Sequence, residues 1–163
     1  MRIVHAKLYT MEGAPIEDGF LRVENGRIAE LGDMRDTSVQ PDDLNAEGGW
    51  LLPGLVDIHT CLGLKEECSR VEGNDFNESS DPLAPQLRAL DGFYAGDKAV
   101  EMARRAGVTT VVTMSGNMNL IGGQAMAVRL RGNTTGEMCM QACCGIKMAL
   151  GEEPRAAYGA AGK

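Results

Sequence analysis

The sequence has few of the features that several large protein classes require. It holds only two histidines, His5 and His59, so one copy of the chain cannot assemble a metal site from several histidines. No apolar run approaches the roughly 20 residues that cross a bilayer. The first residues lack the apolar core and the small-residue cleavage site of a signal peptide. We therefore expect no membrane partner and no secretion.

Common nucleotide and hydrolase signatures are also missing. Neither a P-loop nor a G-x-G-x-x-G stretch occurs, which disfavours a nucleotide cofactor. There is no G-x-S-x-G element, and no serine or cysteine has a recognisable histidine–acid partner. A formal net charge of −7 and a pI near 4.8 argue against nucleic acid or an anionic membrane as a partner.

The cysteines do not indicate a disulfide framework. There are five, an odd number, at Cys61, Cys68, Cys139, Cys143 and Cys144. Without a secretory signal, this favours a reducing, cytoplasmic location. The adjacent pair near residue 143 has no second pair to complete a zinc ribbon, so we predict small apolar side chains in a buried strand.

The first 50 residues have the pattern of a small antiparallel β unit. Apolar and polar residues alternate over 3–9, which predicts a strand. Two more short strands are predicted at 20–23 and 27–31, and they flank Asn25-Gly26, a strong hairpin signal. The polar segment 37–49 predicts a loop or a short edge segment.

A strand–helix–strand pattern follows Trp50. Residues 55–59 predict a short buried strand. Apolar residues at helical spacing predict a helix over 97–106, with Asp97 as N-cap and Gly107 after its end. The β-branched run 108–114 predicts a strand covered on both faces, so the whole reads as a βαβ unit.

The segment after this unit is less regular. A third strand is predicted within 140–150, and a short element of uncertain type around 125–130. Gly122-Gly123-Gln124 is predicted in a βα loop that approaches substrate. The acidic stretch 66–81 fails the calcium-loop pattern. A solvated loop is its simplest interpretation, and substrate contact is the alternative.

The segment from Leu51 to Gly63, LLPGLVDIHTCLG, is the most informative part of the chain. The strand ends in His59, and Cys61 follows two residues later. Residues two apart in a strand point to the same face. Both residue types bind transition metals, so a partial metal site is predicted at this strand end. Asp57 shares the face, either as a carboxylate that orients His59 or as a residue bonded to a backbone N–H.

This strand resembles the first barrel strand of the amidohydrolase superfamily, which reads PG-(L/I)-(V/I)-D-x-H-x-H. The stretches DPLAPQLRALDG, AGVTTVVTMSGNMNLIGGQ and KMALGEEPRAAYG also look similar to bacterial amidohydrolases, and the order of elements resembles the imidazolonepropionase-like branch. The resemblance implies an α/β fold. Residues 1–50 would form an N-terminal β-sandwich portion, and residues 51–163 the first strands and helices of an incomplete (β/α)8 TIM-type barrel.

The activity implied by the resemblance is metal-dependent hydrolysis of the C–N bond in a linear or cyclic amide of a small molecule. One or two divalent ions, with Zn²⁺ expected, would activate a water. His59 would be a metal ligand. Cys61 stands where the family has its second histidine, and a thiolate weakens the Lewis acidity that hydrolysis needs. The catalytic residues stay undetermined, because the family's general base is an aspartate from a later strand.

Two further ligands are implied by the resemblance. Lys147 near the end of the third strand would correspond to a carbamylated, metal-bridging lysine, although that lysine normally comes from the fourth strand. The alternative is that the aliphatic part of the Lys147 side chain packs beside the core. Glu152 would correspond to a glutamate ligand that some members carry after the third strand.

The length of the chain limits this interpretation. A closed barrel takes about 250 residues, and the residues after 50 suffice for about three βα units. We therefore expect an N-terminal fragment that has no turnover alone. The competing hypothesis is a non-catalytic association module, or a truncated gene product, that self-associates through exposed barrel edges.

Overall fold

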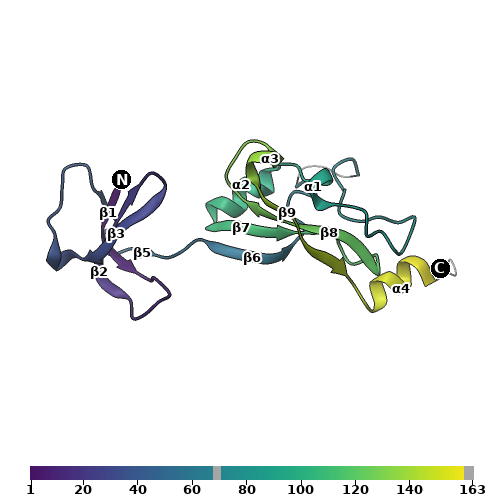
Figure 1. Ribbon diagram of the computed structural model, residues 1–163, viewed down its shortest axis with the longest axis horizontal. Helices are drawn as coiled ribbons and strands as arrows, with labels where there is room; N and C mark the ends of the chain where they lie inside the picture. Colours follow the sequence, from purple (N-terminus) through teal and green to yellow (C-terminus); the bar gives the residue numbers. More distant parts are fainter. Residues whose placement is uncertain (68–70, 160–163) are drawn as a thin grey trace. The chain divides into compact units, whose positions relative to one another are not determined.

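The computed structural model describes residues 1–67 and 71–159, which form two compact units, Met1–Pro53 and Gly54–Lys163 (Figure 1). Each unit is described by itself. Cys68 lies outside the described residues. In the described part of the chain, no helix is long and apolar enough to cross a membrane.

The first unit is built on one five-stranded sheet. Its order is β3-β2-β1-β4, and β5 also pairs with β1. The strands β1 (Arg2–Leu8), β2 (Ile16–Glu24) and β3 (Arg27–Asp33) are antiparallel. The short strands β4 (Leu44–Asn45) and β5 (Trp50–Leu51) run parallel to β1. The described residues of this unit thus form a single sheet, and the sandwich stays an expectation.

The predicted hairpin is confirmed. Asn25 and Gly26 join β2 to β3 with φ values of 49° and 73°. Two successive positive φ values are the geometry of a type I′ turn, which Asn-Gly adopts with little strain. A short 3-10 helix, η1 (Met34–Asp36), follows β3. Its Met34 packs with Val4 and Phe20 in the small core of this unit.

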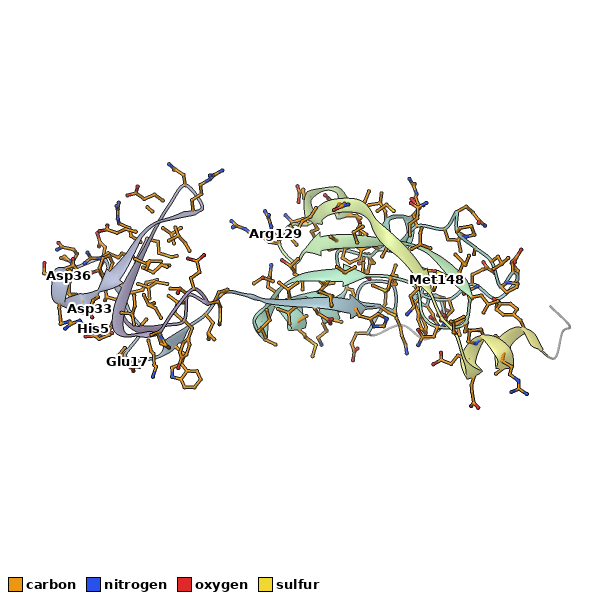
Figure 2. All side chains as sticks on the ribbon, turned by 60° about the horizontal axis from the view of Figure 1, so that its bottom comes forward. His5, Glu17, Asp33, Asp36, Arg129 and Met148 are labelled. Carbon is orange, nitrogen blue, oxygen red and sulfur yellow. The ribbon has the colours of Figure 1, made fainter. Side chains whose placement is uncertain are left out.

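One partly buried ion pair connects the start of the chain to the segment before β4. The guanidinium of Arg2 donates to both carboxylate oxygens of Asp43, at 2.9 and 2.5 Å, and the Asp43 side chain is only 5% exposed. Other ionisable side chains of the unit are partly or fully exposed, among them His5, Glu17, Asp33 and Asp36 (Figure 2).

The second unit is built on a four-stranded sheet of order β6-β7-β8-β9. Its strands are β6 (Leu55–Thr60), β7 (Val108–Thr113), β8 (Ile121–Arg129) and β9 (Cys139–Met148). Strands β6 and β7 are parallel, as the predicted βαβ unit requires, but β8 is antiparallel to both neighbours. The sheet is therefore mixed rather than a series of parallel barrel strands, and the barrel stays an expectation.

The prediction of a glycine loop at 122–124 was wrong. These residues lie inside β8, and the element of uncertain type at 125–130 is the rest of the same strand as far as Arg129. Glycines usually indicate loops. Here they sit in a strand because neighbouring groups approach too closely for a side chain. A Cβ on Gly123 would lie 2.5 Å from the carbonyl oxygen of Leu87.

The helices cover one part of this sheet. The crossover from β6 to β7 contains α1 (Ala89–Gly92) and α2 (Lys98–Arg105), and α3 (Thr135–Met138) and α4 (Glu152–Tyr158) flank β9. The predicted caps of α2 are confirmed. The Asp97 side chain accepts from the backbone N–H of Ala99, and Gly107 beyond the helix has φ 94°. The core of the unit combines helix, loop and strand residues: Leu64, Ala89, Phe93, Val100, Val111, Met126, Val128, Leu130 and Met138.

Two predictions of burial were wrong. The strand at 55–59 forms, but Leu55, Val56 and Ile58 are all exposed. Cys143 and Cys144 lie in a strand, as predicted, yet both are exposed. Both errors have the same cause, because β6 and β9 are the outer strands of the sheet. An apolar sequence pattern shows that a strand suits burial, but it does not show whether anything covers that strand.

Candidate functional site

The carboxyl ends of β6 and β9 bring two predicted site residues together. His59 is the fifth residue of β6 and Lys147 the ninth of β9, and His59 Nε2 lies 2.9 Å from Lys147 Nζ. Two strands separate β6 from β9. With neighbouring strands about 4.8 Å apart, the backbones are about 14 Å apart in a flat sheet. The two side chains therefore reach toward each other over one face of the sheet.

A glycine on the intervening strand lies beside the lysine and against Ser115. A Cβ on Gly122 would lie 3.5 Å from Lys147 Cγ and only 2.3 Å from Ser115 Oγ. The Ser115 hydroxyl donates to the Gly122 carbonyl at 2.8 Å. The side chain of Lys147 thus passes close to the start of β8, and the Ser115 hydroxyl leaves no room for a Cβ at Gly122.

The roles of the two nitrogens in this contact depend on the tautomer of the His59 ring. An ammonium group only donates hydrogen bonds, so beside an ammonium at Lys147 the acceptor would be His59 Nε2. A metal ion at Nε2 would bind through this same lone pair, so it would compete with Lys147 for it.

Cys61 lies within electrostatic reach of the pair. Burial raises the pKa of the Cys61 thiol, and the positive charges of Lys147 and Lys65 lower it by less. The side chain is half-buried. The thiol is therefore mostly protonated near neutral pH, whereas metal binding and nucleophilic attack both need the thiolate.

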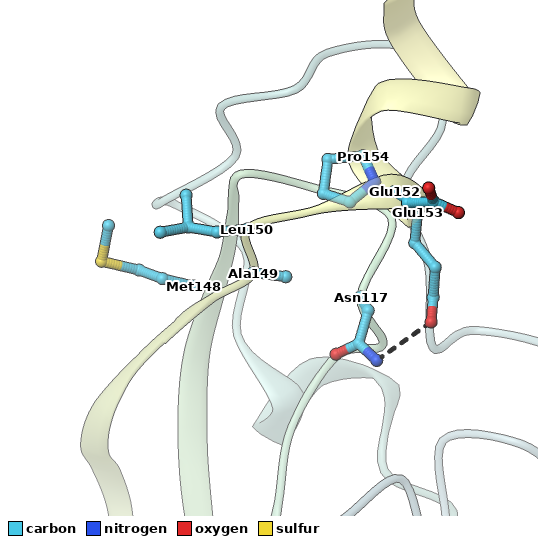
Figure 3. Close-up of a pocket in the computed structure, with 7 residues that line it drawn as sticks. All are labelled: Asn117, Met148, Ala149, Leu150, Glu152, Glu153 and Pro154. Carbon is cyan, nitrogen blue, oxygen red and sulfur yellow. Dashed lines mark hydrogen bonds between the residues drawn. The ribbon is translucent and has the colours of Figure 1, made fainter.

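The other two predicted residues make different contacts. Asp57 Oδ1 accepts from the backbone N–H of His59 at 3.0 Å, so it braces the strand end rather than the imidazole. Glu152 begins α4 and lines a cavity of about 420 Å³ with Glu153, Asn117 and Pro154 (Figure 3). Asn117 Nδ2 donates to Glu153 Oε1 at 3.4 Å. Among the described residues, Glu152 makes no hydrogen bond or ion pair with His59 or Lys147.

A second cavity of about 420 Å³ was not predicted from the sequence. It lies between the loop after β6, the helix α1 and the start of β8, and its polar lining includes Asn77, Arg88, Ser115 and Gln124. Asn77 Oδ1 is buried without a hydrogen-bond partner. The available signal was the position of Ser115 two residues after the end of β7, since residues at the carboxyl ends of parallel strands line ligand sites.

The donors present do not make a complete metal site. Within residues 1–67 and 71–159, no three side chains among His, Cys, Asp and Glu converge on one point. His59 Nε2 lies against Lys147 Nζ, and the raised pKa of Cys61 favours its protonated thiol. Structural zinc takes four ligands and catalytic zinc three from the protein. The residues of this chain therefore do not fit a resident metal as they are arranged.

Comparisons with known proteins show which proteins the chain is similar to. No family model matches it. It is 46% identical over 118 residues to an imidazolonepropionase of Aromatoleum aromaticum, covering 62% of this chain. It is 32% identical over 114 residues to an amidohydrolase of Hapsidospora irregularis, covering 68% of this chain. The crystal structure of an amidohydrolase from Thermotoga maritima superposes on 99% of this chain with a TM-score of 0.89 and 33% identity.

The chain belongs to the amidohydrolase superfamily. It spans only part of its relatives, namely 29% of the imidazolonepropionase, 12% of the Hapsidospora amidohydrolase and 42% of the Thermotoga chain. Members of this superfamily generally use a divalent metal. Against that background, the pairing of His59 with Lys147 is the feature of this amidohydrolase chain that most needs a functional explanation.

Proposed function

We propose that this chain is part of a hydrolase that acts on non-peptide C–N bonds, in an amide or cyclic amide, and that it has no turnover alone. The convergence of His59 and Lys147 at the ends of β6 and β9 carries the proposal. In an α/β fold, reactive groups gather at the carboxyl ends of parallel strands. The names of the relatives support the reaction class.

The roles of the chain's own residues follow from their contacts. Lys147 Nζ lies 2.9 Å from His59 Nε2, and as a hydrogen-bond donor it would occupy the lone pair of that nitrogen. A bound divalent ion, with Zn²⁺ expected, would polarise a carbonyl and activate a water in the complete enzyme. The described donors do not form such a site, so this chain on its own supplies one side of the site and no hydrolytic step. This is the reason to expect no activity from it.

Metal content and activity test the proposal together. We would measure zinc by elemental mass spectrometry in the native chain, His59→Ala, Cys61→His and Lys147→Met. We would also assay a panel of lactams and linear amides with added Zn²⁺. The expected result is substoichiometric zinc and no turnover in the native chain. Lys147→Met should bind more zinc than the native chain because the His59 Nε2 lone pair is released.

The matched control is Lys98→Met, an exposed lysine on α2, which should leave zinc binding unchanged. Amide hydrolysis that rises with added Zn²⁺ and is lost in His59→Ala would contradict the proposed inactivity. Equal zinc in Lys147→Met and in the native chain would contradict the role assigned to Lys147.

A further inference from the structure

A buried threonine at the end of β7 contacts the segment that carries His59 and Cys61. Thr113 is 0% exposed, and its hydroxyl donates to the backbone carbonyl of Leu62 at 2.8 Å. Leu62 directly follows Cys61 in the chain. A buried hydroxyl needs a hydrogen-bond partner, and here the partner belongs to the turn after β6. The contact therefore connects the core of the second unit to the candidate site.

The main chain of β7 makes a second contact with the same segment. The N–H of Met114 donates to the carbonyl of Thr60 at 2.9 Å. The hydroxyl of Thr60 in turn accepts from the N–H of Leu62 at 3.2 Å. Any residue except proline could supply the main-chain contact at position 114, whereas the contact with the Leu62 carbonyl needs the hydroxyl of Thr113.

The pairing of β6 with β7 is irregular where His59 lies. Asp57 is the partner of Val111. The next pair along the two strands is Thr60 with Thr113, so two residues of β6 stand against one residue of β7. This is the count of a β-bulge, which re-aims side chains and is frequent beside active sites. The pair of Thr60 with Thr113 ends the bulge and thereby limits the directions that His59 can take.

The direction of His59 is critical because its partner comes from a distant strand. Lys147 reaches it from β9, across two strands, with 2.9 Å between Nζ and Nε2. A hydrogen bond weakens steeply as its angle departs from linear, so a small rotation of the end of β6 would separate the two groups. Contacts of this kind depend on supporting residues that are themselves held in place by packing. Thr113, buried beneath the segment, meets that requirement.

We propose that Thr113 is a positioning residue of the candidate site: its hydroxyl anchors the Leu62 carbonyl and so aims His59 at Lys147. It acts through the main chain of residues 60–62. The importance of Thr113 for hydrolysis rests on the proposed function, but its effect on the contact between His59 and Lys147 does not, because that contact is present without turnover.

The nitrogen-15 chemical shifts of the His59 ring report this contact. They would be measured on the full chain by long-range proton–nitrogen correlation NMR at about pH 8.5, above the ordinary histidine pKa of about 6.5. The chain has two histidines, so His59→Ala assigns the signals, and His5 in the first unit is an internal reference. Lys147→Met defines the ring shifts in the absence of the contact.

Substitutions of Thr113 test the anchor. Thr113→Val keeps the shape of the side chain and removes the hydroxyl, so the His59 ring shifts should move from the native values to those of Lys147→Met. Thr113→Ser restores the donor and should restore the native values. The matched control is Thr109→Val, which removes another β7 hydroxyl that faces a β6 carbonyl, 3.5 Å from the oxygen of Leu55 at the opposite end of the strands. It should leave the His59 shifts unchanged.

Several outcomes would overturn the proposal: native ring shifts in Thr113→Val, equal changes in Thr113→Val and Thr109→Val, or no recovery in Thr113→Ser. Equal shifts in the native chain and Lys147→Met would also overturn it, because the contact would then be absent in solution. Urea unfolding checks that each variant is folded. If Thr113→Val is not folded, Thr113→Cys replaces it, since a thiol is only a weak donor.

The proposed function fails by a different observation. Amide hydrolysis by the native chain would contradict the proposed lack of turnover and would leave the ring shifts as they are. The two proposals can therefore fail separately.

Discussion

The charge of Lys147 decides the chemistry of its two neighbours at the scale of single residues. As a hydrogen-bond donor it would occupy the Nε2 lone pair of His59, 2.9 Å away, and it offsets part of the rise that burial causes in the pKa of Cys61. We predict that Lys147→Met raises the pKa of Cys61 further, because the lowering charge is gone while the burial remains. Alkylation of Cys61 by iodoacetamide at pH 8 should then be roughly two- to tenfold slower, since the thiolate is the nucleophile.

Peptide mass spectrometry would follow Cys61 separately from the exposed cysteines of β9, as a function of pH. The midpoint of the alkylation profile should move to higher pH in Lys147→Met and stay in place in Lys98→Met. A faster reaction in Lys147→Met would mean that the lysine acts by shielding the thiol rather than by its charge.

Glycines inside β8 decide the geometry at the scale of elements. Gly123 has φ 106°, and a Cβ there would lie 2.5 Å from the Leu87 carbonyl oxygen. We predict that Gly123→Ala destabilises the second unit by roughly 2–3 kcal/mol through backbone strain and this contact. Gly145 on the paired strand β9 has open space around its Cβ position, so Gly145→Ala should change stability by less than about 0.5 kcal/mol. Urea unfolding would measure both, and equal effects would contradict the explanation.

Local features were predicted correctly from the sequence, whereas features that depend on distant contacts were not. Local signals predicted the hairpin at Asn25-Gly26 and the caps of α2, because turn and cap residues act within a few positions of themselves. Strands were also predicted over 108–114 and within 140–150, and the structure has β7 at 108–113 and β9 at 139–148. The strand at 121–129 was missed. Its glycines are required by close contacts with Leu87 and Ser115, and no sequence pattern shows those contacts.

The candidate site likewise combines a local feature that the sequence predicted with a long-range contact that it did not. The two-residue spacing predicted that His59 and Cys61 project together, and the resemblance brought Lys147 into consideration. The contact between His59 and Lys147 depends on the curvature of the whole sheet over 88 residues of sequence separation, so no local pattern contains it. Glu152 was included through resemblance alone, and the structure places it in a different cavity.

At the scale of the whole molecule, carboxylates in both units make folding stability depend on pH. Hydrogen bonds hold the pKa values of four carboxylates below their ordinary range: Asp33 and Asp43 in the first unit, Glu78 and Asp91 in the second. A carboxylate whose pKa is lower in the folded state stabilises that state above its unfolded pKa. This stabilisation is lost as the pH falls through the folded pKa. Both units should therefore lose stability below about pH 4.

The Arg2–Asp43 pair allows this effect to be assigned to one unit. The Arg2 guanidinium is the main cause of the lowered pKa of Asp43. We predict that Asp43→Asn destabilises the first unit at pH 7 and flattens its decline in acid, while the second unit is unaffected. Backbone hydrogen exchange resolved over β1–β3 and β7–β9 would separate the two units. Asp42→Asn, a change at an exposed neighbour without a hydrogen-bond partner in the described residues, should leave both acid profiles unchanged. An Asp43→Asn chain whose first unit keeps the native acid slope would show that other carboxylates govern its stability.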